Sequence, residues 1–201
     1  GIISIENKQK GTKFLWDSIN HVSPEYSKVP TKEWGMNNND YFHMNAVRIL
    51  KDGNYLASAR HTQTIMKIDK NSGEIIWHMG KGKLNNFKFI NDPYNGFSHQ
   101  HAPEELNNGN ILIWDNGIDS IKDGSRVAEY KIDETNFTAT LVWSKIFKNL
   151  QANVAGNCYQ INRNQFIAAF GSQGYIEEFN KDGTKVLSIE PGGLIYQVRK
   201  S

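Results

Sequence analysis

Two histidines, His99 and His101, stand two residues apart just before a turn rich in asparagine and glycine. On an extended strand, residues two apart point to the same side, so both imidazoles would face one way. The apolar run 111–114 predicts the returning strand of a hairpin, which ends in Asp115 and Asn116. This hairpin would bring a carboxylate and an amide back beside the two imidazoles. A packed core does not need such a polar cluster, and a neutral imidazole can serve as a nucleophile or a metal ligand.

The composition is that of an ordinary globular protein. Of 201 residues, 38% are hydrophobic and 22% charged, and the net charge is +2. So small a charge predicts neither a nucleic-acid partner nor an anionic membrane surface. No apolar run approaches the roughly 20 residues of a membrane-spanning helix, so we expect no membrane span. The single cysteine, Cys158, excludes an intrachain disulfide and is expected to be a small buried hydrophobe.

Strand patterns recur along the chain in units of similar length. Segments 43–80, 99–147 and 154–190 each contain four short strand patterns, with first turns centred at 53, 109 and 163. These turns lie 56 and 54 residues apart. Four strands per unit at such a period are typical of propeller blades. We therefore predict an all-β fold, a β-propeller built of four-stranded antiparallel blades. A meander of hairpins without radial symmetry is the alternative.

Both ends of the chain look strand-like but incomplete. Residues 1–20 predict a partial blade of two strands, residues 21–40 a long loop, and residues 193–199 a tail strand that could complete the partial blade. A closed ring would remove exposed strand edges. We expect residues 1–201 to form one propeller-type domain, partial or shortened. On this interpretation the chain is a piece of something longer, or a leader has been removed from it.

Propeller geometry predicts where the polar residues meet. In each blade the innermost strand lines the central channel, and its start lies on the same face as the end of the second strand. We therefore expect eight side chains to approach one mouth of one channel: His43, Asn45, Arg60, His61, His99, His101, Asp115 and Asn116. Binding sites favour such concave openings on a rigid scaffold.

Several separate motifs occur along the first two units. They are His43-Met44-Asn45, the run from Asp52 to His61, the run from Ile68 to Trp77, Gln100-His101, the run from Gly109 to Gly117, and Ser125 to Tyr130. In this order they resemble the bacterial arylsulfate sulfotransferase family. The resemblance is strong over residues 40–130 and extends to the rest of the chain only as the blade pattern.

The resemblance implies a six-bladed propeller that moves a sulfuryl group from a phenolic sulfate ester to a phenolic acceptor, without a nucleotide sulfate donor or any cofactor. It implies that His101 is the nucleophile and forms a sulfohistidine intermediate, supported by His43, Asn45 and Arg60. It also implies a periplasmic or secreted location. The chain departs from the family in holding only three complete units. The family also has a further active-site histidine upstream of His43. In this chain His21 lies upstream of His43, but it does not stand in a comparable motif.

Sulfuryl transfer explains why these residue types are present. The sulfur is shielded by three oxygens that share negative charge, so attack needs a neutral nitrogen lone pair with cations around those oxygens. Arg60 offers a planar fork of fixed charge to the oxygens. His43 and Asn45 can donate hydrogen bonds as charge develops on the bridging phenol oxygen. We assign His99 and Asn116 to substrate binding, with an exposed or supporting position as the alternative for His99.

Other functions stay open from the sequence. His99 and His101 could join His43 and Glu104 in a metal site, because His-x-His on one strand face is a familiar ligand arrangement. Such a site would suit a metal-dependent lyase or hydrolase, although our assignment includes no metal. A non-catalytic propeller that binds a ligand or a protein is a third option. The sequence also leaves homo-oligomers open.

Some of these polar residues also have structural explanations. Asp115, Asn116 and Gly117 suit a tight loop in which Asx side chains accept hydrogen bonds from neighbouring backbone amides. Arg126 could form an ion pair with Asp115 instead of touching a ligand. We expect His61 to be structural.

Overall fold

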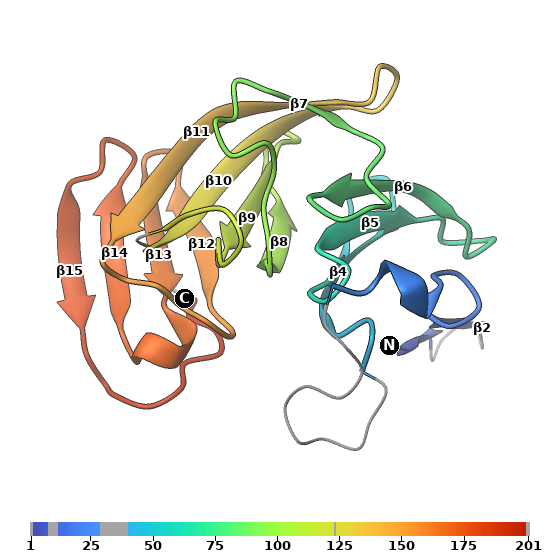
Figure 1. The fold of residues 1–201 in the computed structure, drawn as a ribbon, viewed down its shortest axis with the longest axis horizontal. Coiled ribbons are helices and arrows are strands. Elements are labelled where there is room, and N and C mark those ends of the chain that lie inside the picture. Colours follow the sequence, from blue (N-terminus) through green and yellow to red (C-terminus); the bar gives the residue numbers. More distant parts are fainter. Residues whose placement is uncertain (1, 8–11, 29–39, 123, 200–201) are drawn as a thin grey trace.

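The protein consists almost entirely of short β-strands. A computed structural model describes residues 2–7, 12–28, 40–122 and 124–199 (Figure 1). The strands are β1 (Ile2–Asn7), β2 (Thr12–Asp17), β3 (Met44–Ile49), β4 (Tyr55–Ala59), β5 (Thr64–Ile68), β6 (Ile75–Gly80), β7 (Lys88–Ile90), β8 (His101–Glu105), β9 (Ile111–Asp115), β10 (Gly124–Asp133), β11 (Thr138–Lys148), β12 (Asn157–Asn162), β13 (Gln165–Ala169), β14 (Ile176–Asn180) and β15 (Lys185–Ile189). Two 3₁₀ turns, η1 (Pro24–Tyr26) and η2 (Gly171–Gln173), interrupt the loops. No helix in the described part of the chain is long and apolar enough to cross a membrane.

Three antiparallel sheets follow one another along the chain and form three blades. The first blade contains β3 to β6, the second β8 to β11 and the third β12 to β15, and within each blade the strands pair in sequence order. Figure 1 shows the three sheets side by side, from the first blade in teal to the third in orange and red. This arrangement agrees with the predicted fold class.

The second blade carries a fifth strand that we did not expect. β7 pairs in parallel with β11, where Phe89 lies opposite Ala139. The pairing continues at its end, where Lys88 N donates to Phe137 O at 2.8 Å. β7 belongs to the connection between the first and second blades, so its pairing covers the edge of the second sheet that would otherwise be free.

The first hairpin turns of the blades share one local chemistry. In the first blade, Asp52 Oδ1 accepts the backbone N–H of Asn54 at 2.9 Å, and Gly53 between them has a φ of 86°. Such a φ favours glycine, which lacks a Cβ. Equivalent Asx bonds join Asn110 to Asn108 and Asn164 to Asn162. The recurrent turn in the sequence is therefore a recurrent Asx turn in the structure.

Apolar side chains packed between neighbouring sheets hold the blades together. The cluster between the first and second blades contains Leu56, Ile65, Trp77, Met79, Phe97, Ile113 and Tyr130. The cluster between the second and third contains Trp114, Phe147, Phe166, Phe170 and Phe179. Full burial of a large apolar side chain stabilises the folded state by about 1.5–3 kcal/mol. These shared layers fix how each blade stands beside the next.

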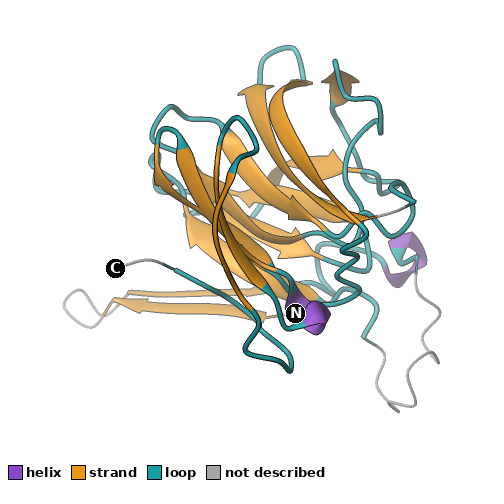
Figure 2. Ribbon diagram, turned by 90° about the vertical axis from the view of Figure 1, so that its left-hand side faces the viewer, coloured by secondary structure: helices purple, strands orange, loops and turns teal. Residues whose placement is uncertain are grey.

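The β1–β2 hairpin precedes the first blade. Figure 2 shows it extending away from the body of the molecule at one end. At the other end Ile3 and Trp16 are buried in the first blade's outer cluster with Phe42 and Met66. The Trp16 indole also donates to Gly73 O at 3.1 Å. Within the predicted loop 21–40, residues 29–39 lie outside the described residues.

The strand predicted over residues 193–199 is wrong. The segment is irregular and lies against the third blade, where Ile195 N donates to Gly171 O at 3.0 Å. The Asn157 side chain bonds both the N–H and the C=O of Val198, at 2.7 and 2.9 Å. The described backbone hydrogen bonds of the segment go to a carbonyl of η2 and to the Asn157 side chain, so its alternating apolar pattern has no ladder to join. Nor does it complete the β1–β2 sheet.

Candidate active site

The candidate residues gather where the inner strands of the first two blades begin. His43 immediately precedes β3 and His101 opens β8, while Arg60 follows β4 and Asn116 follows β9. Antiparallel pairing places the start of each inner strand beside the end of the next strand, as where His101 lies opposite Trp114. The backbone N–H of Arg60 donates to His43 O at 3.0 Å. The pairing thus collects these side chains at one end of the sheets.

His101 is held by Asn116 in one tautomer. Its Nδ1 lies 2.9 Å from Asn116 Oδ1 and 3.1 Å from His99 O. The Asn116 amide is oriented by its own Nδ2, which donates to the carbonyls of Ala152 and Ala155 at 2.7 and 3.0 Å. Both atoms beside Nδ1 are acceptors, so Nδ1 carries the proton and Nε2 the lone pair. No described residue bonds to that Nε2. Asn116 is fully buried, which favours orientation of His101 over the substrate contact we expected.

Burial keeps both central imidazoles neutral. Removal from water lowers the pKa of His101 to about 4, against the opposing effect of the hydrogen bond that Nδ1–H donates to Asn116, and the charge of Arg60 lowers it further. Burial also lowers the pKa of His99 to about 4, with Arg60 acting in the same direction and Asp119 against it. At neutral pH both rings are therefore uncharged. His101 keeps its Nε2 lone pair available.

We expected His99 and His101 to lie on one regular strand, and the structure contradicts this. β8 begins only at His101, and His99 before it has a φ of 55°, in the left-handed region. The His99 ring accordingly turns to other partners: its Nδ1 lies 3.4 Å from Gln63 Nε2 and 3.8 Å from Asp119 Oδ2. The Gln63 side chain also donates to the Asp119 carboxylate. His99 is thus part of a second polar group beside the first.

Gln100, between the two histidines, anchors this segment to the first blade. Its side chain is fully buried. Its Nε2 lies 3.1 Å from Ser58 Oγ, 3.1 Å from Ala59 O and 2.9 Å from Thr64 O. Its backbone carbonyl accepts the Asn45 amide at 2.8 Å. The nucleophile candidate is therefore attached to both neighbouring sheets.

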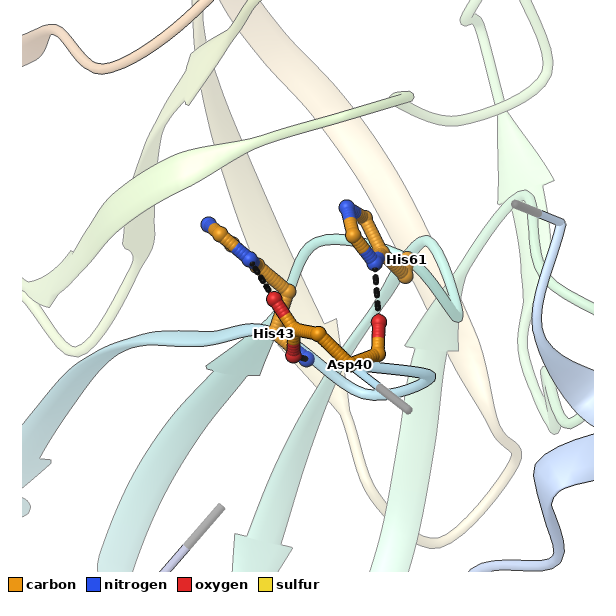
Figure 3. Close-up of side chains that lie close together, drawn as sticks. All are labelled: Asp40, His43 and His61. Carbon is orange, nitrogen blue, oxygen red and sulfur yellow. Dashed lines mark hydrogen bonds and ion pairs between the residues drawn. The ribbon is translucent and has the colours of Figure 1, made fainter. Parts of the chain in front are cut away.

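Asp40 holds His43 and His61 side by side (Figure 3). The Asp40 carboxylate bonds His43 Nδ1, and its backbone carbonyl accepts His61 Nδ1 at 2.6 Å. The two rings stack with centroids 4.6 Å apart. Partial burial would raise the pKa of Asp40, but His43 outweighs it and the pKa is lowered. Each ring keeps its Nε2 free of Asp40, and His61, which we expected to be structural only, belongs to the site.

Arg60 is a buried fixed charge with unused donors. Its side chain is 6% exposed, and Nη2 donates to Asn153 O at 3.0 Å. Its Nε–H is buried without a partner among the described residues. Burial lowers the pKa of Arg60, opposed by Asp119 and Asp40, yet a guanidinium stays protonated in proteins. Arg60 can therefore offer several N–H groups and a full charge to an anion.

A small cavity of about 60 Å³ lies beside His101. Asn45 and Arg48 of β3 and Tyr196 of the irregular tail line it. Asn45 Oδ1 and Arg48 Nε are buried without a hydrogen-bond partner in the described part of the chain. The cavity thus presents a second guanidinium donor next to the imidazole.

A different group of side chains could hold a metal ion. Among the described residues, the acidic, cysteine and histidine side chains whose ligand atoms cluster are those of Asp40, His43 and His61, within 4.8 Å of one another. His99, His101 and Glu104 are not in this group, so the metal ligand set suggested by the sequence is wrong. Glu104 instead lies near Arg48 and Arg199, and its burial raises its pKa.

Comparison with protein families decides the relationship. Residues 1–193 match the family described as Arylsulfotransferase (ASST). The chain belongs to the arylsulfotransferase family. Membership suggests arylsulfotransferase activity. A comparison with curated proteins found no match.

Two solved structures share the fold of this arylsulfotransferase-family chain. One is a protein of unknown function from Bacteroides caccae, with 15% identity and a TM-score of 0.52 over 96% of this chain and 55% of that one. The other is the β-propeller domain of Myceliophteria thermophila Cps50 (Swd1), with 13% identity and a TM-score of 0.55 over 96% and 52%. The predicted propeller fold is confirmed. The chain spans about half the length of these structures.

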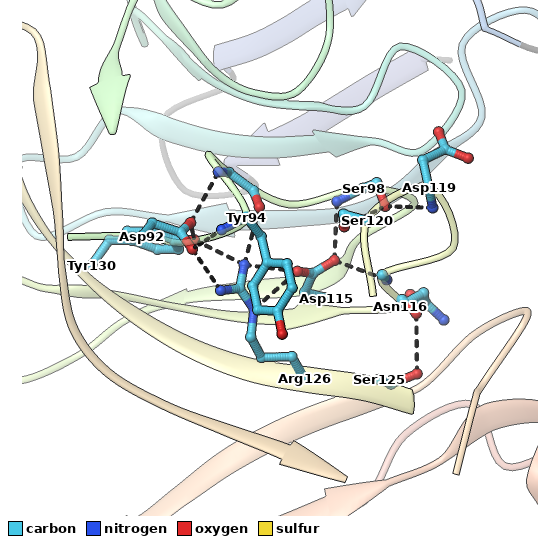
Figure 4. Close-up of polar contacts among 12 residues, drawn as sticks. Asp92, Tyr94, Ser98, Asp115, Asn116, Asp119, Ser120, Ser125, Arg126 and Tyr130 are labelled. Atoms are coloured by element: carbon cyan, nitrogen blue, oxygen red, sulfur yellow. Dashed lines mark hydrogen bonds and ion pairs between the residues drawn. The ribbon is translucent and has the colours of Figure 1, made fainter. Parts of the chain in front are cut away.

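A buried ionic network lies next to the segments that carry His99, His101 and Asn116 (Figure 4). Arg126 lies between two carboxylates, 2.9 Å from Asp115 Oδ2 and 2.8 Å from Asp92 Oδ1, and all three side chains are fully buried. The other oxygen of Asp115 accepts the backbone N–H of Ser98 at 3.0 Å and of Gly117 at 2.9 Å. The predicted pairing of Arg126 with Asp115 and the tight Asx loop are both confirmed. The network fixes the two segments that carry the histidines and Asn116.

The sequence did not point to several residues of the site. Gln100 was visible only as the neighbour of His101, and nothing in its type indicated three donor contacts. Arg48 and Tyr196 lie in different segments from His101, and only the fold brings them to it. Asp40 stands three residues before His43, but only the fold brings it to His61. A search for charged residues along the predicted inner strands would have found Arg48, the fifth residue of β3 and three residues after Asn45.

Proposed function

We propose that this chain carries the active centre of an aryl sulfotransferase. His101 would take a sulfuryl group from a phenolic sulfate ester and pass it to a phenolic acceptor, without a nucleotide donor or a cofactor. One observation carries the proposal: a buried neutral imidazole whose Nδ1 is held by Asn116 and whose Nε2 has no partner among the described residues. The chain spans about half the length of the structures it matches. The proposal therefore concerns the activity of the whole protein as well as that of this chain.

In the first step, His101 Nε2 attacks the sulfur of the donor. The N–S bond forms as the bond from sulfur to the phenol oxygen breaks, and a phenolate leaves. The imidazole ring becomes cationic, with its proton on Nδ1. Asn116 Oδ1 faces that proton and stabilises the charge that develops there. A low imidazole pKa ensures that the lone pair is present at neutral pH.

Two guanidinium groups would bind the sulfuryl oxygens. Arg60 and Arg48 each have a buried Nε–H without a partner among the described residues. Arg48 shares the cavity with His101, and the charge of Arg60 lowers the pKa of the same ring. Charge-assisted bonds from arginine suit a group whose oxygens share negative charge.

His43 and Asn45 would act on the leaving oxygen. The Asp40 carboxylate holds His43 by Nδ1, so it can stabilise a proton on the ring, as carboxylates do for catalytic histidines. His43 then offers an Nε2–H to the departing phenolate. In the second step an acceptor phenol gives its proton to the phenolate that the donor released. Its oxygen attacks the same sulfur, and the N–S bond breaks with its electron pair returning to His101 Nε2.

The test is turnover of a chromogenic aryl sulfate with an added phenol. We expect colour release in the native chain and none in His101→Ala, with circular dichroism showing the same sheet content in both. A His21→Ala variant is the matched control, because His21 is an exposed histidine outside the candidate site, and it should keep the activity of the native chain. If the folded native chain binds phenolic sulfates without turnover, the alternative function of a non-catalytic binding module is favoured.

One observation favours a second candidate, a metal-dependent lyase or hydrolase: the cluster of Asp40, His43 and His61. The Nδ1–H groups of His43 and His61 donate to the carboxylate and the carbonyl of Asp40, which leaves both Nε2 atoms for a metal. Many metal-bound histidines are held in this way. A chelator arm in the same assay separates the two. Chelator-resistant turnover supports sulfuryl transfer through His101, and chelator-sensitive turnover supports the metal.

We further propose that the partners of this site are small phenolic molecules and not nucleic acid. We also propose a periplasmic or secreted location, since the family is generally periplasmic. The small net charge of +2 supports the first part. Size-exclusion chromatography with light scattering tests whether the chain forms a homo-oligomer.

A further inference from the structure

Tyr196 is a phenol placed inside the candidate site. It lines the same cavity as His101, and their rings meet edge to face with centroids 6.4 Å apart. Its hydroxyl donates to Asn45 O at 3.2 Å. An enzyme that delivers a sulfuryl group to phenols would therefore hold one phenol of its own beside the nucleophile.

The backbone around Tyr196 is fixed rather than free. On one side Ile195 N donates to Gly171 O at 3.0 Å. On the other, the Asn157 side chain bonds both backbone groups of Val198, at 2.7 and 2.9 Å. The ring itself is 56% exposed and makes one described hydrogen bond. The anchored backbone keeps the phenol at the cavity, while the exposed side chain can rotate toward His101.

We propose that Tyr196 is an internal acceptor and becomes sulfated by His101 of the same chain. This inference rests on the proposed function of His101. The Tyr196 hydroxyl attacks the sulfur of the sulfohistidine, a new O–S bond forms, and the N–S bond breaks with its electron pair returning to Nε2. The phenol proton passes to the phenolate that the donor released. The sum is a donor phenol and a tyrosine sulfate ester, with His101 neutral again.

Arg48 makes the cavity suitable for the product. Its guanidinium lines the same cavity, with Nε–H buried and unpartnered in the described part of the chain. It can bind the sulfate ester formed on Tyr196. A modified Tyr196 would then occupy the cavity beside His101 and compete with free phenols, so that the chain's own tail regulates acceptor access.

Peptide mapping can locate the group unambiguously. Cleavage after lysine and arginine places His101 in fragment 89–122 and Tyr196 in fragment 186–199, which contains no histidine. We would incubate the full chain with 4-nitrophenyl sulfate and no acceptor, stop the reaction at neutral pH and follow both fragments by mass spectrometry. We expect one sulfuryl group on 89–122 first, then on 186–199. Tyr196→Phe should lose the second label only, and Tyr175→Phe, whose hydroxyl bonds Glu177 instead, should keep both.

The outcomes separate this inference from the proposed function. Label on 89–122 that never reaches 186–199 overturns the role of Tyr196 and leaves His101 in place. Label on neither fragment overturns both. A mixture of His101→Ala and Tyr196→Phe chains tests whether transfer is internal. Label on fragment 186–199 in that mixture would show transfer between chains and contradict the internal route.

Discussion

At the residue scale, the proposed chemistry depends on the contact between His101 and Asn116. The amide is locked by two carbonyls, so it presents only an acceptor to Nδ1. A bond of this kind fixes which nitrogen can attack. Motif resemblance pointed to His101, Arg60, His43 and Asn45, but the sequence could not show the amide's orientation. That orientation depends on Ala152 and Ala155, which lie in another segment of the chain.

The low pKa of His101 predicts the acid limb of the pH profile. Since the free imidazole is needed, kcat/KM should fall only as the pH drops toward about 4, because this ratio reports the free enzyme. In Asn116→Asp the added carboxylate would favour the imidazolium, raise the pKa and move the acid limb to higher pH. Steady-state kinetics from pH 3.5 to about 8 would measure both, a range that brackets an ordinary histidine pKa near 6.5. An acid limb near that ordinary value in the native chain would contradict the burial argument.

Two arginines provide a matched comparison of catalytic and structural roles. In Arg60→Lys the charge stays but the planar fork is lost, so we expect turnover to fall by about 10²-fold or more with a small change in melting temperature. In Arg126→Lys the two buried carboxylates lose bonds, so the melting temperature should fall. Kinetics and thermal melts on both variants distinguish a catalytic from a structural role for each arginine. A melting temperature that falls in step with activity in Arg60→Lys would mark Arg60 as structural.

At the scale of elements, strand β8 is positioned by Gln100. Its buried amide gives hydrogen bonds to the second strand and to the start of the third strand of the neighbouring blade. Gln100→Ala would leave those acceptors without their partner, and we expect the free energy of unfolding to fall by about 1–3 kcal/mol. Activity should fall as well, because His101 is the next residue. Chemical denaturation measures the first effect.

The control is Gln173→Ala, since Gln173 is exposed and donates to Gln151 O on the surface. We expect it to leave unfolding nearly unchanged. Equal destabilisation by both substitutions would contradict the role of the buried Gln100 hydrogen bonds in positioning β8.

The sequence predicted the strands and turns better than it predicted the contacts of single side chains. Alternating apolar residues and Asx–glycine turns sufficed for the three four-stranded units, since both signals are local. The tail 193–199 has the same alternation, yet no strand edge accepts it, and Asn157 takes its backbone groups instead. β7 was missed for the opposite reason, because three residues carry too little pattern and its partner β11 lies some fifty residues on.

At the scale of the whole molecule, shared apolar layers set the angle between blades. Phe170 is fully buried between the second and third blades, with Trp114 and Phe147 at centroid distances of 5.1 and 4.6 Å. Phe170→Ala should therefore cost about 3–5 kcal/mol of unfolding free energy. Val186→Ala is the control, since that side chain on the last strand is 50% exposed. Denaturant titration measures both, and a loss below about 1 kcal/mol for Phe170 would contradict a shared core.

The central claim is that His101 carries the sulfuryl group, and peptide mapping of fragment 89–122 tests it most directly. After brief exposure of the full chain to an aryl sulfate without acceptor, the native protein and His99→Ala should each carry one sulfuryl group on this fragment. His101→Ala should carry none, although its fragment keeps His99 and Tyr94. Label that persists in His101→Ala, or turnover without any label on this fragment in the native protein, would contradict the account.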